Sequence, residues 1–223
     1  MEFAKKLTDF IAFILAIILP ANCLACDKFG ESICGRCIEL LPKEQSPYGV
    51  MTFFAYSDSV VQKAIWLIKY KGASSVIKPF ARIIRERIIE ELSETNELML
   101  TRGEKIVIIP VPLSKERLKE RGFNQAEVLA KEIIKIDGGQ SFILGNNVIE
   151  KIKNTPTQVS IKNRSERLKN LKGAFALINT NAIKDRIVIL LDDVSTTGTT
   201  LDECAKVLKH AKPRKIIKMA LAH

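Results

Sequence analysis

The sequence lacks any hydrophobic run long enough to cross a membrane. Its longest apolar run, Phe10 to Leu19, has ten residues, whereas a membrane-spanning helix needs about 20. The sequence also shows no internal repeat and no low-complexity tract, which argues against a repeat architecture and against a long compositionally biased segment. These absences leave a globular protein as the class to expect.

The apolar run near the N-terminus has two interpretations. Lys5 and Lys6 precede it, and a basic start before a run of this length is typical of a signal peptide. The alternative is a helix buried against the rest of the protein. A lipoprotein signal fits poorly, because Asn22 stands before Cys23 where a small residue is needed. We favour the buried helix, because the residues that follow are typical of a cytoplasmic protein.

The composition favours one medium-sized domain with a basic surface. Of the 223 residues, 47% are hydrophobic and 27% are charged, which supports a sizeable core and leaves room for a small module. The net charge is +10, and residues 51–223 hold 30 basic and 19 acidic residues. Such a domain suits a polyanionic small molecule, with nucleic acid as a second inference. A solvated basic surface is the alternative, and charge alone does not choose between them.

Four of the five cysteines form two close pairs, Cys23-Leu-Ala-Cys26 and Cys34-Gly-Arg-Cys37. Two such pairs joined by a short loop predict a tetrahedral zinc site made of four thiolates. Disulfides are the alternative, but pairs spaced this closely are poor structural disulfides. Because protein ligands fill all four positions, the zinc would be structural rather than catalytic. The fifth cysteine, Cys204, is expected in the core.

The apolar pattern beyond the cysteines predicts alternating strands and helices. Several strands separated by helices indicate an α/β fold with a mostly parallel sheet flanked by helices. Arg82, Arg85 and Arg87 are expected in solvent on the outer face of one helix. We expect a helix and zinc module over residues 1–45 and the larger domain over 46–223. Strands are predicted near residues 51, 106, 147, 174, 187 and 215, with the one near 174 at an edge. Helices are predicted over 57–70, to about 94 with Pro79 in the first turn, up to about 136, and over 200–210.

One stretch of the larger domain, Ile187 to Thr200, carries the strongest chemical signal. Its first five residues are apolar and rich in β-branched types, which predicts a strand buried on both faces. Asp192 and Asp193 follow at the carboxyl end, where ligands bind in open α/β sheets. Hydroxyl residues, a glycine and a helix start come next, and this combination suits a phosphate. An ordinary strand, turn and capped helix is the alternative.

This order of apolar strand, two acidic residues and Thr-Thr-Gly-Thr-Thr resembles the signature of the type I phosphoribosyltransferases. The resemblance implies that the loop holds the 5-phosphate of phosphoribosyl pyrophosphate (PRPP), which binds with Mg²⁺, and that the acidic pair holds the ribose hydroxyls. The residues that it assigns to PRPP binding are Asp192, Asp193, Val194, Ser195, Thr196, Thr197, Gly198, Thr199 and Thr200.

A second part of the expected site follows the strand near residue 106. The sequence Pro110-Val-Pro-Leu-Ser turns the chain, because prolines cannot continue a central strand. In type I phosphoribosyltransferases the equivalent turn exposes backbone N–H groups to the pyrophosphate. The resemblance therefore assigns this role to Val111, Leu113 and Ser114, whereas Pro112 has no N–H group to donate.

The residues after this turn narrow the resemblance to the ComF family. Pro-Val-Pro-Leu-Ser and then Arg-Gly-Phe-Asn-Gln-Ala, behind a four-cysteine zinc module, are similar to that family over nearly the whole chain. The resemblance allows Arg117 and Arg121 to pair with pyrophosphate oxygens through bidentate contacts. An exposed helix start is the alternative for both. Further residues that match the family pattern are Asn124, Gln125, Thr157, Gln158, Arg167, Asn170, Ala174 and Phe175.

A polar, basic segment separates two of the predicted strands. Residues 151–173 hold seven basic residues and one Glu. A polar insertion of this length is typical of an active-site lid, and in the resembled fold a mobile hood closes over PRPP here. The segment could instead contact a DNA backbone, and the sequence allows both.

Three hypotheses follow for function. The first is a cytosolic ComF-family protein that binds PRPP and Mg²⁺ and supports natural transformation, by handling single-stranded DNA alongside other competence proteins. The second is an active phosphoribosyltransferase with an unidentified nitrogen acceptor. A glutamine amidophosphoribosyltransferase is not expected, because the sequence holds no glutaminase half. The third is a nucleic-acid-binding module without PRPP binding, and the intact acidic pair and threonine loop argue against it.

Overall fold

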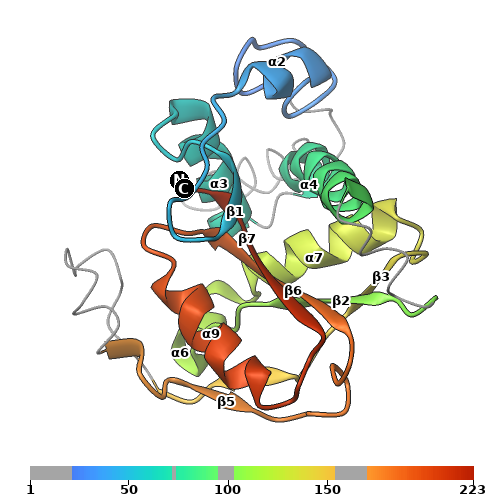
Figure 1. Cartoon of the computed structure of the whole chain (residues 1–223). Helices are drawn as coiled ribbons and strands as arrows, with labels where there is room; N and C mark the ends of the chain where they lie inside the picture. The colour runs from blue at the N-terminus through green and yellow to red at the C-terminus, as the bar shows by residue number, and fades with distance from the viewer. Residues whose placement is uncertain (1–21, 72–73, 95–102, 154–169) are drawn as a thin grey trace.

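A five-stranded parallel sheet forms the centre of the protein (Figure 1). The computed structural model describes residues 22–71, 74–94, 103–153 and 170–223. All neighbouring strands of this sheet pair in parallel, in the order β1-β7-β6-β2-β3. The strands are β1 (Met51–Phe54), β2 (Ile106–Pro110), β3 (Phe142–Leu144), β6 (Ile187–Val194) and β7 (Lys215–Ala222).

Apolar residues on both faces of the central strands explain why the sheet is covered by helices on both sides. Ile108 and Ile189 face one core with residues of α3 (Ser59–Lys71), α4 (Ser74–Glu94) and α7 (Gln125–Ile136). Val107 and Val188, one residue earlier on each strand, face a second core with residues of α9 (Thr199–Lys209). Successive strand residues point to opposite faces, so these continuous β-branched runs supply both cores. The predicted α/β architecture is confirmed.

Two of the predicted strands do not join the main sheet. β4 (Ile149–Lys151) and β5 (Phe175–Leu177) pair with each other in an antiparallel two-stranded sheet. Both contact α9, so they lie beside the helix that follows the threonine loop. The expectation that the strands near 147 and 174 belong to the parallel sheet is therefore wrong. The fifth parallel strand is β3, which the sequence reading missed.

The position of β3 depends on a buried carboxylate and a glycine. Asp137 has a fully buried side chain and accepts hydrogen bonds from the N–H groups of Ser141 (2.6 Å) and Phe142 (3.3 Å). Arg85 of α4 forms an ion pair with it at 3.2 Å, so the expectation that Arg85 is only solvated is wrong. After β3, a Cβ at Gly145 would lie 2.7 Å from the Val107 side chain. Only glycine lets the chain leave the sheet edge this closely.

The basic run after the turn at Pro110 is itself a short helix, α6 (Lys115–Arg121). Gly122 ends it in the left-handed region at φ 79°, and the Asn124 side chain then caps α7 by accepting a hydrogen bond from Ala126 N–H at 3.0 Å. Two helices therefore replace the single one expected here. Pro79 lies in the second turn of α4 rather than the first, because that helix begins at Ser74.

Some predicted features lie outside the described residues. These include the apolar run from Phe10 to Leu19 and most of the basic segment, residues 154–169. Within the described ranges, every helix is too short or too polar to cross a bilayer.

Candidate functional site

The loop between β6 and α9 is held in a tight, glycine-dependent shape. Gly198 stands before the first residue of α9 with φ 71°, a conformation that L side chains rarely adopt. A Cβ at this position would also lie 3.1 Å from Tyr48 Cβ and 3.4 Å from Val50 Cγ2. The segment before β1 therefore packs directly against the loop, and glycine satisfies both the backbone angle and the contact.

Backbone contacts to the end of β7 fix the start of this loop. Ser195 N–H donates to the carbonyl oxygen of Ala222 at 2.9 Å, and the Ser195 carbonyl oxygen lies 2.6 Å from His223 Nδ1. The hydroxyl oxygen of Ser195 is buried and has no hydrogen-bond partner among the described residues. Thr197 Oγ1 and Thr199 Oγ1 lie 3.1 Å apart. The loop thus gathers several hydroxyl groups at the N-terminus of α9, where the helix dipole favours an anion.

The two carboxylates at the end of β6 lie in different surroundings. Asp193 is buried, and its Oδ2 lies 3.0 Å from Nζ of Lys69 on α3. Asp192 is partly buried, and its Oδ1 accepts a hydrogen bond from Asp193 N–H at 2.9 Å. Desolvation and the negative charge of Asp193 raise the pKa of Asp192 well above its ordinary value. A ligand hydroxyl or a cation at this position would favour the charged form of Asp192, because it would donate a hydrogen bond or supply opposite charge.

The turn after β2 contributes fewer backbone donors than the sequence implied. Val111 N–H already donates to the carbonyl oxygen of Leu191 at 2.8 Å, so it continues the sheet and does not face a ligand. Ser114 is buried, and its hydroxyl oxygen accepts a hydrogen bond from Arg117 N–H at 3.4 Å to cap α6. Leu113 and Ser114 therefore remain the candidates for pyrophosphate contacts on this turn.

The Asn-Gln pair has a structural role that the sequence did not reveal. The Asn124 side-chain amide donates to the carbonyl oxygen of Val111 at 2.9 Å, which ties the turn after β2 to the start of α7. Gln125 is buried, and its Oε1 accepts a hydrogen bond from Arg121 Nη1 at 3.0 Å. These two residues hold the turn and the arginine in place.

The two arginines of α6 take different positions. Arg117 lies close enough to Lys151 for its charge to affect the pKa of that lysine. Arg121 instead lies over the ring of Tyr70 on α3, with Cζ 5.7 Å from the ring centroid. The structure therefore places only Arg117 next to the turn that carries Ser114.

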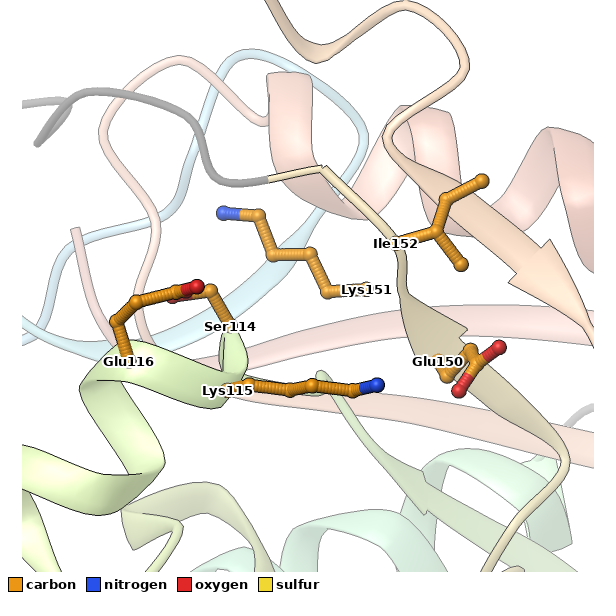
Figure 2. A pocket seen from close by; sticks show the side chains of 6 residues that line it. All are labelled: Ser114, Lys115, Glu116, Glu150, Lys151 and Ile152. Carbon is orange, nitrogen blue, oxygen red and sulfur yellow. The ribbon is translucent and has the colours of Figure 1, made fainter.

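A pocket of about 140 Å³ opens between the start of α6 and β4 (Figure 2). Figure 2 shows the Lys151 side chain reaching from β4 toward the α6 side of this pocket. Desolvation, followed by the positive charge of Arg117, lowers the pKa of Lys151. A cationic side chain held in this way is suited to a polyanion, which would restore its charged form. The residues that line the pocket are Ser114, Lys115, Glu116, Glu150, Lys151 and Ile152.

Sequence reasoning missed Lys151 as a site residue. The only signal was its place at the start of the basic segment, after the short strand pattern at Val148 and Ile149. Of the predicted family-motif residues downstream, Asn170 is exposed and stands ahead of β5. Gln158 and Arg167 lie outside the described residues.

The four N-terminal cysteines come together as a possible metal site. Their Sγ atoms all lie within 4.8 Å of one another, with Cys34 Sγ 3.9 Å from Cys23 Sγ and 3.8 Å from Cys26 Sγ. Four sulfurs bound to one zinc at about 2.3 Å would lie about 3.8 Å apart. All five cysteines are free thiols, so the disulfide alternative is not supported. Cys204 belongs to α9, and its side chain is buried in the second core, as expected.

The thiols of this cluster differ in acidity. Burial raises the pKa of Cys23, but hydrogen bonds from backbone N–H groups, first that of Cys34, lower it overall to about 6. The neighbouring Cys34 and Cys26 side chains raise the pKa of Cys37 to about 12. Cys23 thus ionises readily while Cys37 holds its proton, and a divalent cation bound by the cluster would stabilise thiolates.

Comparison with known proteins agrees with this geometry. Residues 83–223 match the family model of the phosphoribosyl transferase domain. Competence protein F of Haemophilus influenzae is 30% identical over 79% of this chain and 72% of its own length. Competence protein ComFC of Bacillus subtilis is 30% identical over 70% of this chain and 55% of its own length.

A third relative carries a different name. DNA utilization protein YhgH of Salmonella typhimurium is 27% identical over 78% of this chain and 70% of its own length. The matched domain, the four-cysteine cluster and these relatives agree with one another. The chain belongs to the phosphoribosyl transferase domain family and, within it, to the ComF group of competence and DNA utilization proteins.

Proposed function

We propose that this protein binds PRPP together with Mg²⁺ at the carboxyl edge of the parallel sheet. The observation that carries the proposal is the loop from Asp192 to Thr200, where two carboxylates precede a glycine-dependent turn at the N-terminus of α9. The loop hydroxyls and the helix N-terminus receive the 5-phosphate, and the acidic pair accepts hydrogen bonds from the ribose hydroxyls. Mg²⁺ neutralises charge on the pyrophosphate when it is bound.

The pyrophosphate end of the ligand fits the pocket beside α6. Lys151 and Arg117 supply positive charge there, and Leu113 and Ser114 follow β2 at the same sheet edge. Charge-assisted hydrogen bonds to phosphate oxygens are stronger than neutral ones. The ribose lies between the two groups, because the acidic pair of β6 and the end of β2 are neighbours in the sheet.

The cellular role we propose is support of natural transformation in the cytoplasm. Relatives named as competence and DNA utilization proteins favour this role. The excess of 30 basic over 19 acidic residues after residue 50 favours contact with single-stranded DNA through its phosphates. Such contacts weaken steeply as salt concentration rises. Other competence proteins are further partners under this proposal.

We propose zinc as the metal of the cysteine cluster. Four sulfur ligands at these separations match a closed tetrahedral site, and such a site has no open position for chemistry. The metal would therefore stabilise the N-terminal module and leave binding of PRPP to the larger domain.

Calorimetry with PRPP and Mg²⁺ tests the central binding site. We expect the double variant Asp192→Asn/Asp193→Asn to lose PRPP binding, because an amide offers one fewer acceptor oxygen and no charge. Asp185→Asn is the matched control, since Asp185 is exposed before the start of β6 and has φ 59°, which asparagine tolerates. Absence of binding by the folded wild-type protein would overturn the proposal.

A further inference from the structure

One face of α3 exposes two aromatic rings that the PRPP site does not use. Trp66 and Tyr70 are one helical turn apart, with ring centroids 5.6 Å from each other. Their exposed fractions are 51% and 57%. The same helix buries Ile65 and Ile68 in the core, so the aromatic pair occupies the opposite, outward face. Large aromatic residues are usually mostly buried, and a paired exposure of this size calls for a partner.

Positive charge surrounds this aromatic pair. Lys63 lies one turn before Trp66 on the outward face of α3 and is exposed. Arg121 of α6 lies over the ring of Tyr70, which extends the surface from α3 onto a second helix. The sequence of α3 contains no acidic residue. The surface therefore holds two rings, with Lys63 one turn before Trp66 and Arg121 against a face of Tyr70.

The surface also lies next to the candidate PRPP site. Lys69 precedes Tyr70 in α3 and forms an ion pair with Asp193 at 3.0 Å. Adjacent residues of α3 thus contact both the aromatic pair and the acidic pair of β6. A ligand that lies along the rings would run past the rim of the PRPP site.

We propose that Lys63, Trp66, Tyr70 and Arg121 form a platform on which bases of single-stranded DNA stack. Aromatic rings hold unpaired bases through stacking that tolerates any sequence, and flanking cations neutralise the backbone phosphates. A folded duplex buries its bases between their neighbours and cannot stack them on the rings. The proposal rests on the DNA-handling part of the proposed function and locates the surface that performs it.

Trp66 is the only tryptophan of the chain, so its fluorescence reports directly on the platform. An oligothymidylate of about 20 nucleotides should quench this fluorescence, because a base in contact with indole quenches its emission. An abasic deoxyribose-phosphate chain of the same length carries the same charge and should leave the emission nearly unchanged. Quenching by both polymers to the same extent would contradict base stacking.

DNA affinity of variants gives the second test, measured by anisotropy of a labelled oligothymidylate. Trp66→Ala and Tyr70→Ala should each weaken binding about 5- to 100-fold, which is the range for loss of one base–aromatic stack. The control Ile178→Ala also removes an exposed apolar side chain, 52% exposed, and should bind like wild type. Thermal unfolding and PRPP affinity should be unchanged in all three variants.

The outcomes separate the platform from the proposed function. Tight DNA binding by wild type that neither aromatic variant weakens would overturn the platform and leave the DNA-handling proposal standing. A wild-type protein that binds PRPP but no single-stranded DNA would overturn both the platform and the DNA part of the proposed function.

Discussion

The cysteine module and the parallel sheet reach their folded shapes by different physical means. The sheet buries continuous apolar strands on both faces, and β2 is buried at every residue. The module around α2 (Gly35–Leu40) contributes few buried apolar side chains, chiefly Ile33 and Ile38. The four cysteine sulfurs gather inside it, and backbone hydrogen bonds such as that from Leu24 N–H to the Ser32 carbonyl oxygen (2.9 Å) join its loop. We therefore propose that a bound metal takes the place of a core in this short segment, whereas the candidate ligand site depends on the sheet.

The cysteine module and the larger domain share one apolar contact surface. Ile33, Ile38 and Leu41 belong to the same apolar cluster as the residues of α4. The module therefore rests on the larger domain, and the boundary predicted at residue 45 remains a prediction. Loss of the metal should loosen the module and uncover part of α4, with little effect on β6.

Removal of one cysteine ligand should have the largest effect. Cys34→Ser should abolish stoichiometric zinc binding, because Cys34 lies near two other sulfurs of the cluster and a structural zinc contributes about 10 kcal/mol or more. Metal analysis and circular dichroism measure the loss. Cys204→Ala is the control, since it removes a thiol outside the cluster. PRPP affinity that falls as sharply as zinc content would contradict the separation of module and site.

Removal of the carboxylate that anchors β3 should destabilise the sheet. Asp137→Ala leaves Arg85 and two backbone N–H groups without their acceptor, which should cost about 3 kcal/mol in the free energy of unfolding. Urea denaturation measures the change. Glu90→Ala breaks the exposed pair with Arg87 and should cost less than about 1 kcal/mol. Equal costs for the two variants would contradict a buried anchor at Asp137.

A side chain at Gly198 should disturb the loop through a steric contact as well as through backbone strain. Gly198→Ala should cost about 1–2 kcal/mol from the left-handed backbone, and the contact with Tyr48 at 3.1 Å should also displace the loop and weaken PRPP binding. Gly103→Ala is a matched control, because Gly103 has φ 80° and no atom within 4 Å of an added Cβ. Calorimetry should show weaker PRPP binding for the first variant only.

Lys151→Met should weaken PRPP binding and leave the unliganded fold intact. Loss of one charge-assisted contact to phosphate should reduce affinity about 10-fold. The pKa of Lys151 is lowered, so its charge opposes folding at pH values below that pKa. The variant should therefore be at least as stable as wild type at neutral pH. Lys153→Met, two residues later and exposed, is the control, and equal PRPP affinities would exclude Lys151 from the site.

The smallest effect should be a pH dependence at Asp192. Its folded-state pKa is raised by burial and by Asp193, so the folded protein favours the protonated form. Between the ordinary and the raised pKa, wild-type stability should fall as pH rises. Asp192→Asn removes this titration and should be more stable than wild type at neutral pH, but not at pH 3. Urea denaturation of both proteins from pH 3 to neutral pH measures this difference in stability, with Asp185→Asn as the control. Equal stability of the two proteins at neutral pH would refute the prediction.

The loop and the cysteine cluster could be predicted from the sequence, because each depends on residues that are close together in the chain. Asp192, Gly198 and the two Cys-x-x-Cys pairs are close in sequence to the groups with which they act. β3 escaped prediction because it has only three residues and is held by Asp137 and Gly145. Its three apolar residues are too few to show a strand pattern in the sequence.

Strand partners and contacts between residues distant in the chain could not be predicted from the sequence. The strands at 149 and 175 were foreseen as strands, but their partners could not be, because an antiparallel pair and a parallel pair draw on the same apolar residues. Lys69 and Lys151 reach the site from other elements. Arg121 contacts the ring of Tyr70. This contact joins two helices about 50 residues apart in the sequence, so the sequence pattern did not indicate it.

Amide hydrogen exchange with and without Mg²⁺ and PRPP reports directly on ligand binding at the loop between β6 and α9. We expect slower exchange at residues 196–200 and at Leu113 and Ser114 when PRPP is bound, because these amides lie where the phosphate and pyrophosphate would bind. Residues 23–37 of the cysteine module should exchange at the same rate in both states. Unchanged exchange of residues 196–200 at saturating PRPP would overturn PRPP binding at this loop.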